Sequence, residues 1–242
     1  MSGQDRTLDG FLGARLSIAQ PKRGFRAGHD TVLLAAAVPA EVNARVLELG
    51  AGAGVASLCL AARVPGAHVL GVEIDAELVA LANENAARNG MADRVRFELG
   101  DVAGVLGEGA YHHVFFNPPF YPPSGHQSPN AARDRATRDS DAAVIVWTCI
   151  ALAAVKEGGT VTAILRADRV EDMLVVGKGH GAVVFPLFPR VSEASKRAIV
   201  QFLKDSRDPL RRAAGLILHE AGGRNTDAAE AVLRHGAALK LI

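Results

Sequence analysis

The run Phe115-Phe116-Asn117-Pro118-Pro119-Phe120 holds the residues best suited to chemistry. Its two prolines fix a turn and lack N–H donors, so the turn presents carbonyl oxygens. The Asn117 side-chain oxygen and the Pro118 carbonyl form a pair of acceptors, which matches an exocyclic NH₂ group with its two hydrogens. Phe120 offers a face on which a base can stack. A proline-rich turn capped by asparagine would explain the prolines but not the aromatic residue, so the run favours a site for a planar amino group.

A glycine-rich turn lies earlier in the chain. Its sequence is Glu48-Leu49-Gly50-Ala51-Gly52-Ala53-Gly54, with the spacing G-x-G-x-G. Glycines let the backbone bend tightly and let a ligand approach without a Cβ in the way. A dinucleotide fingerprint needs G-x-G-x-x-G, so this turn suits a zwitterionic amino-acid tail better than a pyrophosphate, with Glu48 available to an ammonium group. The alternative is a tight strand-to-helix turn of any α/β protein.

Two acids follow the next two predicted strands. Glu73 closes the second strand at about the position where a Rossmann-type site holds an acid for ribose hydroxyls. Asp101 lies just past the third strand, where it could accept a hydrogen bond from an adenine amino group. Either acid could be a solvated loop residue. Ligands of open α/β sheets bind at the carboxyl ends of the strands, and the glycine turn and both acids fall at that edge.

Short β-branched apolar runs alternate with Ala-rich helical stretches from about residue 44, which predicts a mostly parallel α/β sheet. We expect strands at 45–49, 67–73, 94–99, 113–117 and 160–166, and helices at 55–63, 76–88, 139–155 and 168–176. Asp75 is the expected N-cap of the second helix, Asn89-Gly90 its stop, and Gly158-Gly159 the stop of the third. Two further strands, 180–188 and 197–204, have no long helix between them, so an antiparallel hairpin should close the sheet.

The two ends of the chain add smaller pieces. Ahead of the sheet we expect a strand at 16–18, a turn at 20–24 and a helix at 31–38 behind Asp30 as N-cap. After the hairpin come an apolar run at 216–218 and a helix near 226–234. We therefore expect one domain over 1–242, with a lead-in at 1–40 packed on the sheet, a core at 41–204 and a C-terminal addition at 205–242.

Composition narrows the class of protein. Of the 242 residues 49% are apolar, enough for a sizeable core, and no apolar run approaches the roughly 20 residues needed to cross a bilayer. The polar start lacks the pattern of a signal peptide, and two cysteines are too few for a disulfide scaffold, so we expect a cytoplasmic protein without a membrane partner. A net charge of +1 implies that any RNA is bound through a local basic patch. His112-His113 have no cysteine or carboxylate at ligand spacing, so no metal is expected.

These motifs, taken in order, resemble those of the class I S-adenosylmethionine-dependent methyltransferases. The resemblance implies a Rossmann-like, seven-stranded sheet with helices on both faces and S-adenosyl-L-methionine as cofactor. The segment 20–37, QPKRGFRAGHDTVLLAAA, is similar to the bacterial tRNA1(Val) adenine-N6 methyltransferase family, which implies Gly28 and Asp30 near the methionine end of the cofactor. The implied catalytic residues are Asn117, Pro118, Pro119 and Phe120. The implied cofactor-binding residues are Gly28, Asp30, Glu48, Gly50, Ala51, Gly52, Gly54, Glu73, Ile74, Asp101, Val102 and Asn117.

The acceptor and its contacts stay open at this point. The resemblance favours adenine N6 in tRNA, with guanine N2 of rRNA and the amide of a protein glutamine as alternatives; Phe120 stands where adenine methylases more often have Tyr. A non-catalytic nucleotide-binding module is a further alternative, although binding alone does not require the Asn117 run. Arg133, Arg135 and Arg138 follow that run among acids and read as a solvated face or a phosphate contact. Lys22, Arg23, Arg26 and Lys196-Arg197 could extend the same patch.

Overall fold

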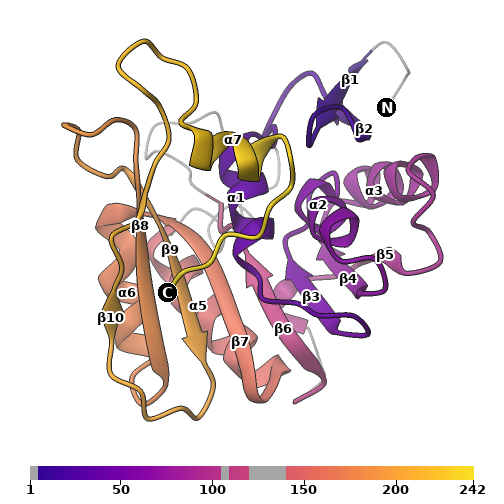
Figure 1. Ribbon diagram of the computed structural model, residues 1–242. Coiled ribbons are helices and arrows are strands. Elements are labelled where there is room, and N and C mark those ends of the chain that lie inside the picture. Colours follow the sequence, from indigo (N-terminus) through magenta and orange to yellow (C-terminus); the bar gives the residue numbers. More distant parts are fainter. Residues whose placement is uncertain (1–4, 105–108, 120–139) are drawn as a thin grey trace.

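One twisted sheet organises the protein (Figure 1). The computed structural model describes residues 5–104, 109–119 and 140–242 of the chain. The sheet has nine strands in the order β10-β8-β9-β7-β6-β3-β4-β5, with β11 beside β8. Its strands are β3 (Arg45–Leu49), β4 (His68–Glu73), β5 (Val95–Leu99), β6 (Tyr111–Phe116), β7 (Val155–Arg166), β8 (Gly181–Phe188), β9 (Arg197–Leu203), β10 (Arg211–Arg212) and β11 (Leu216–Ile217). The strands β3, β4, β5 and β6 run parallel to one another, and β7 pairs parallel with β6.

The antiparallel closing hairpin predicted from the sequence is confirmed. β9 lies between β7 and β8 and is antiparallel to both. β3 to β9 thus form the expected seven-stranded sheet. The two-residue strands β10 and β11 extend it, pairing parallel with β8. β10 was not predicted, because two exposed arginines carry no apolar pattern.

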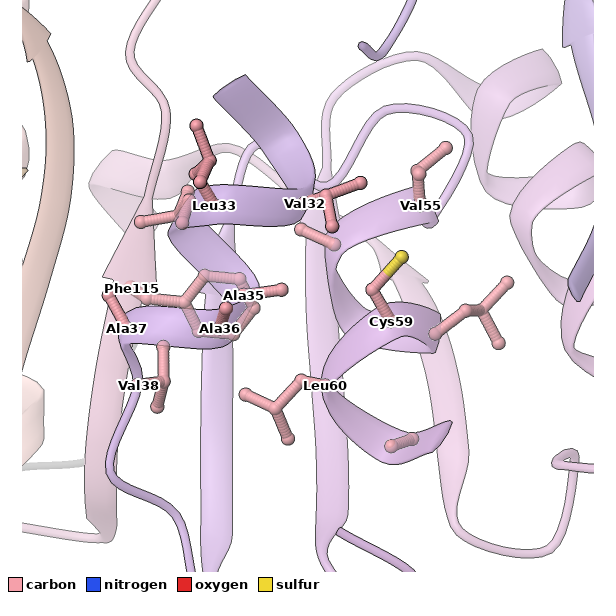
Figure 2. Packing of buried hydrophobic residues seen from close by; sticks show 14 of the residues in the cluster. Val32, Leu33, Ala35, Ala36, Ala37, Val38, Val55, Cys59, Leu60 and Phe115 are labelled. Atoms are coloured by element: carbon pink, nitrogen blue, oxygen red, sulfur yellow. The ribbon is translucent and has the colours of Figure 1, made fainter. Parts of the chain in front are cut away.

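Alternating side chains of the central strands fill two separate cores. On β6, Val114 and Phe116 point to the core that α5 (Ser140–Ala154) and α6 (Val170–Val176) cover. Phe115, between them, points to the opposite core, beneath α1 (His29–Ala37) and α2 (Val55–Arg63). Figure 2 shows side chains of these two helices packed around Phe115. α3 (Ala76–Arg88) covers the same face as α1 and α2, and α7 (Asp227–Leu233) packs on α1.

Of the two predicted helix N-caps ahead of α1 and α3, the structure confirms one and contradicts the other. Asp75 caps α3 as expected, accepting hydrogen bonds from the backbone N–H groups of Glu77 and Leu78. Asp30 as N-cap was wrong: Gly28 is the N-cap of α1, and Asp30 lies inside the first turn. Its carboxylate forms an ion pair with Arg197 at the start of β9, at 3.0 Å. Asp30 therefore pairs with a residue 167 positions later in the sequence instead of capping the helix.

The predicted stop of the third long helix at Gly158-Gly159 was also wrong. α5 ends at Ala154 and passes directly into β7, so both glycines lie within a strand. The pairing with β6 shifts register between Tyr111 and His113. A Cβ on Gly159 would lie 2.5 Å from the carbonyl oxygen of His112, so this glycine allows the two backbones to approach at the irregularity.

The lead-in forms a hairpin rather than the single short strand expected at 16–18. β1 (Arg6–Phe11) pairs antiparallel with β2 (Leu16–Pro21), and the fully buried Asn85 of α3 holds β2 in place. The Asn85 amide accepts from the Ala19 N–H at 2.8 Å and donates to the Ala19 carbonyl at 2.9 Å. It also donates to the Ala53 carbonyl of the glycine turn at 3.0 Å. One amide thus fastens the lead-in beside the turn.

Replacing Asn85 should test this fastening. We expect Asn85→Ala to lower the free energy of unfolding by about 3 kcal/mol, because it removes three hydrogen bonds and leaves buried backbone groups unpaired. Urea denaturation measures the loss. Asn83→Ala is the matched control, since Asn83 lies on the same helix and also makes three hydrogen bonds, to backbone groups of Val79 and Phe97, but is only half-buried, so water can replace part of what is lost. An equal loss in both variants would contradict a special role for Asn85.

Candidate functional site

The strand register brings the predicted site residues to one edge of the sheet. Leu49, the last residue of β3, pairs with Val72 of β4 and with Phe116 of β6. Glu73, the last residue of β4, pairs with Leu99, the last of β5. The segments that follow these residues therefore emerge side by side. From β6 to β5 they begin with Asn117, Gly50, Ile74 and Gly100, and Asp101 comes next.

The glycine turn after β3 is held between two aromatic rings. The N–H groups of Gly50 and Ala51 both donate to the Val72 carbonyl, at 2.8 and 3.1 Å. A Cβ on Gly50 would lie 2.5 Å from the ring of Trp147 on α5, and a Cβ on Gly54 would lie 2.5 Å from the ring of Phe97 on β5. Gly50, Gly52 and Gly54 all have left-handed φ angles of 68°, 55° and 81°. Side chains are excluded from both ends of the turn.

Gly52, in the middle of the turn, has a different environment. Among the described residues other than its two chain neighbours, no atom lies within 4 Å of the position that its Cβ would occupy, so this part of the structure leaves the turn open to a ligand at Gly52. The Gly52 N–H donates to Oε2 of Glu73 at 2.8 Å. The other oxygen of Glu73 accepts from the N–H groups of Ile74 and Asp75, at 2.9 and 3.0 Å. A carboxylate has about four acceptor positions, so Glu73 braces the turn and keeps capacity for a ligand hydroxyl.

Glu48 is a buried residue among the predicted site residues. Only 5% of it is exposed, and its carboxylate accepts from the backbone N–H and the hydroxyl of Ser57 in the first turn of α2. Burial raises the pKa of Glu48 to about 8, and the charge of Glu73 adds to the rise while the Ser57 bonds oppose it. The structure thus gives Glu48 a partner inside the protein, at the root of the turn.

Asn117 carries an unpaired oxygen at this edge. Its side-chain Oδ1 is buried and finds no hydrogen-bond donor within the described ranges of the chain. Most buried polar atoms have a partner, and an unpaired one costs roughly 1–3 kcal/mol. A donor from a ligand would remove that cost. Pro118 beside it is buried and Pro119 half-buried, so the turn is anchored.

Apolar surface flanks the acids of the same edge. Ile74 is 50% exposed and Leu99 is 61% exposed, while Val102 is buried. Asp101 is exposed, and one of its carboxylate oxygens accepts from the Ala103 N–H at 2.9 Å. Ile74 and Leu99 leave an apolar surface for a flat ring beside Glu73. Leu99 was not predicted, because its exposure follows from its place at the end of β5 and has no sequence signal.

Trp147 is a second residue of this edge that the sequence did not reveal. It meets Gly50 on one side, and its ring packs edge-on against Phe116, with centroids 5.9 Å apart. It therefore supports both the glycine turn and the strand that ends before Asn117. Trp147 lies in a nearly uniformly apolar helix, where nothing distinguishes it from a core residue. Phe120, Arg133, Arg135 and Arg138 lie outside the described residues.

Comparison with known proteins identifies the family to which the chain belongs. Residues 26–139 match the family model described as "Methyltransferase small domain". A Porphyromonas gingivalis protein named tRNA1(Val) (adenine(37)-N6)-methyltransferase is 31% identical over 174 residues, 68% of each chain. The chain belongs to the class I S-adenosylmethionine-dependent methyltransferases. An Actinobacillus succinogenes protein of the same name is 25% identical over 83% of this chain and 86% of its own.

Solved structures agree with the fold of this methyltransferase. A predicted O-methyltransferase from Agrobacterium tumefaciens superposes with a TM-score of 0.74 at 25% identity, over 87% of this chain and 98% of that one. A Pyrococcus horikoshii protein, TYW2 in complex with MeSAdo, has a TM-score of 0.58 at 15% identity, over 85% of this chain and 74% of that one, which bears on the fold alone. Within the described residues, no helix is both long and apolar enough to cross a membrane.

The cofactor of the methyltransferase is S-adenosyl-L-methionine, and the edge of the sheet fits it. The open position over Gly52 admits a ligand against the backbone, and Glu73 retains acceptor capacity for a hydroxyl. Ile74 and Leu99 offer apolar contact for a purine, and Asp101 lies close by in the chain. Gly28 is the exposed N-cap of α1, and in the described parts of the chain nothing beyond its two neighbours lies within 4 Å of its Cβ position, as a residue near the methionine end would need.

Glycine substitutions should separate support of the turn from access of the cofactor. We expect Gly50→Ala to lower the free energy of unfolding by about 2–4 kcal/mol and to weaken cofactor binding, because the new Cβ collides with Trp147. Gly28→Ala, with a φ of −144° and open space, should cost about 1 kcal/mol or less and weaken cofactor binding alone. Urea denaturation and titration calorimetry give the two quantities.

Gly90→Ala is the control for backbone strain. Its φ of 67° matches the 68° of Gly50, but nothing lies within 4 Å of its Cβ position. It should therefore show the cost of the left-handed backbone without the collision. If Gly50→Ala proves no more harmful than Gly90→Ala, the contact with Trp147 does not constrain the turn.

Proposed function

We propose that this methyltransferase transfers a methyl group to the exocyclic N6 of an adenosine in tRNA, as a cytoplasmic enzyme. The buried, unpaired Oδ1 of Asn117 carries the proposal, because it needs a donor and stands in a turn rich in carbonyl oxygens. An amino group with two hydrogens can donate one hydrogen bond to the Asn117 side-chain oxygen and the other to the Pro118 carbonyl. The names of the relatives support tRNA and adenine as the acceptor.

Positioning of the acceptor nitrogen is the main task of the protein in this proposal. S-adenosylmethionine, when bound, would supply a methyl group carried on a positively charged sulfur. The leaving group would be that sulfur, as a neutral thioether. The nitrogen of an aromatic amine is a poor nucleophile, because its lone pair is delocalised into the ring. Two acceptors at Asn117 and Pro118 favour a pyramidal nitrogen and hold it in line with the methyl group. They also stabilise the positive charge that develops on the nitrogen during transfer.

Proton release needs no base from the chain. Once the new N–C bond forms, the nitrogen is positively charged and its remaining hydrogens are strongly acidic, so one passes to water after the transfer. Glu48, whose pKa is raised by burial, bonds to Ser57 at the root of the glycine turn and has no part in this step. Phe120, by sequence the neighbour of Pro119, is proposed to stack on the acceptor base.

Removal of the Asn117 amide should separate binding from chemistry. We expect Asn117→Ala to bind cofactor within about two-fold of the wild type and to lose about a hundred-fold or more in kcat, the usual effect of losing one preorganised group of this kind. Calorimetry measures the first and single-turnover methylation the second. Gln201→Ala, which removes a half-buried amide from β9, is the control. Activity within a few-fold of the wild type in Asn117→Ala would overturn the mechanism.

The identity of the acceptor is tested directly. The protein is incubated with labelled S-adenosylmethionine and unmodified total tRNA, which is then digested to nucleosides. We expect the label in N6-methyladenosine, and labelling that weakens as salt rises, because phosphate contacts are screened. Label in N2-methylguanosine would replace adenine by guanine as the acceptor. An absence of label in RNA, with labelled glutamine in a protein fraction, would refute the RNA assignment.

A further inference from the structure

We propose that the segment 22–25, here called the loop tip, is an RNA-binding element in which Phe25 stacks on an unpaired base and Arg23 contacts a phosphate. The inference rests on the proposed function, since it takes the substrate to be RNA. It assigns a role to residues outside the cofactor site and the Asn117 turn. Three observations carry it: a closed base, an exposed aromatic tip and a position at the rim of the site.

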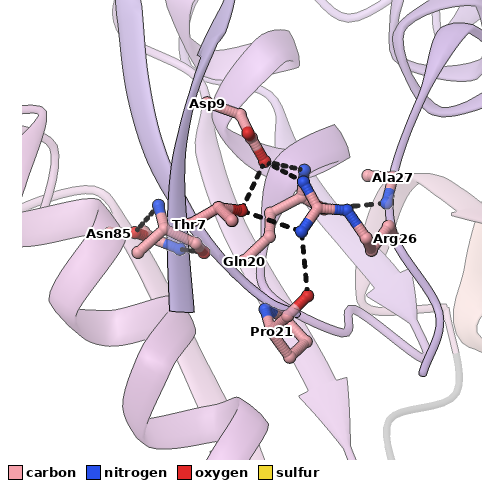
Figure 3. Close-up of polar contacts among 8 residues, drawn as sticks. Thr7, Asp9, Gln20, Pro21, Arg26, Ala27 and Asn85 are labelled. Carbon is pink, nitrogen blue, oxygen red and sulfur yellow. Dashed lines mark hydrogen bonds and ion pairs between the residues drawn. The ribbon is translucent and has the colours of Figure 1, made fainter. Parts of the chain in front are cut away.

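The base of the loop is closed by buried and paired side chains. Gln20, only 2% exposed, accepts from the Ala27 N–H at 2.8 Å and donates to Asp9 at 2.8 Å. Arg26 donates to the Pro21 carbonyl at 3.0 Å and forms an ion pair with Asp9 at 2.7 Å. Figure 3 shows this network, with Arg26 at its centre. Residues 21 and 26–27 are therefore fixed, and the four residues between them project from a firm base.

The tip itself presents an aromatic ring to solvent. Lys22, Arg23, Gly24 and Phe25 are all exposed, and 68% of Phe25 is accessible. Gly24 has a left-handed φ of 91° with nothing near its Cβ position, which lets the chain turn between Arg23 and Phe25. Binding loops for single-stranded nucleic acid combine such a cation and ring, because every base has a face that stacks on an aromatic side chain. The firm base lowers the ordering cost of binding.

The loop tip lies at the rim of the cofactor edge. On its N-terminal side, β2 and the glycine turn share the amide of Asn85, through Ala19 and Ala53. On its C-terminal side, Gly28 begins α1, whose Asp30 is paired with Arg197 at the start of β9. Residues 20–28 contain no acid, and of their three cationic side chains Arg26 is paired with Asp9 at the base of the loop, while the exposed Arg23 lies at the tip. An RNA strand that delivers an adenosine to Asn117 therefore meets a basic, aromatic loop at the edge of the site.

A variant series tests stacking against simple apolar contact. Binding of unmodified total tRNA is measured by filter retention in the presence of S-adenosylhomocysteine, and cofactor affinity by calorimetry. We expect Phe25→Ala and Phe25→Leu to raise the Kd for tRNA about ten-fold, whereas Phe25→Trp keeps it near the wild-type value, because leucine has no face for stacking. Val175→Ala, on α6 and 75% exposed, is the control for loss of an exposed apolar side chain.

Arg23 gives an independent readout. Arg23→Gln should weaken tRNA binding and lower the slope of log K against log salt by about one, whereas Phe25→Ala should leave the slope unchanged. An unchanged Kd in Phe25→Ala, or a Phe25→Leu variant that binds as well as Phe25→Trp, would overturn the inference. An equal loss of cofactor affinity in Phe25→Ala would overturn it too, since the ring would then belong to the cofactor site.

Failure of the proposed function gives a different result. If tRNA binds in a manner that depends on Phe25 but receives no methyl group, the loop tip is an RNA contact and the assigned reaction is wrong. If tRNA is methylated with the same KM by the wild type and Phe25→Ala, the reaction stands and the loop tip has no role in it.

Discussion

The turn after β3 excludes side chains at both of its ends, and aromatic residues from two sides of the sheet impose that constraint. Phe97 of β5 closes one end at Gly54, and Trp147 of α5 closes the other at Gly50. The two rings come from opposite cores of the sheet, so the turn is supported from both faces. Because Trp147 also packs on Phe116, the glycine turn and the strand that ends before Asn117 rest on the same side chain. A change of packing in either core is therefore expected to alter the geometry of the glycine turn and of the Asn117 turn.

Local signals predicted a large share of the fold. The bounds of β3, α2 and α3 are those expected from apolar runs, glycines and the Asp75 cap, because each of these features acts within a few residues. The errors arose where a distant partner decides. Gly158 and Gly159 are typical of a helix stop, yet the approach of the β6 backbone makes that segment a strand. β1 exists because β2 is available to pair with it.

The candidate site divides in the same way. That Asn117, Gly50, Glu73 and Asp101 meet could be inferred, since parallel strands bring their carboxyl ends to one edge. How each side chain is engaged could not. Glu73 accepts three backbone N–H groups, and Glu48 turns inward to Ser57. Both follow from side-chain directions that only the assembled sheet defines. Trp147 was missed because an apolar helix gives no indication of which residue faces the ligand edge.

Trp147 is the only tryptophan of the chain, and it lies against Gly50 of the glycine turn. The emission of the protein when excited at the red edge of its absorption therefore comes from one indole. Its wavelength and quenching describe the surroundings of Gly50 and Phe116 rather than an average over the molecule. If this edge rearranges while the core stays folded, the emission wavelength of Trp147 will shift before the circular dichroism spectrum changes. The methyltransferase thus contains its own fluorescent reporter, placed between the glycine turn and the strand that ends before Asn117.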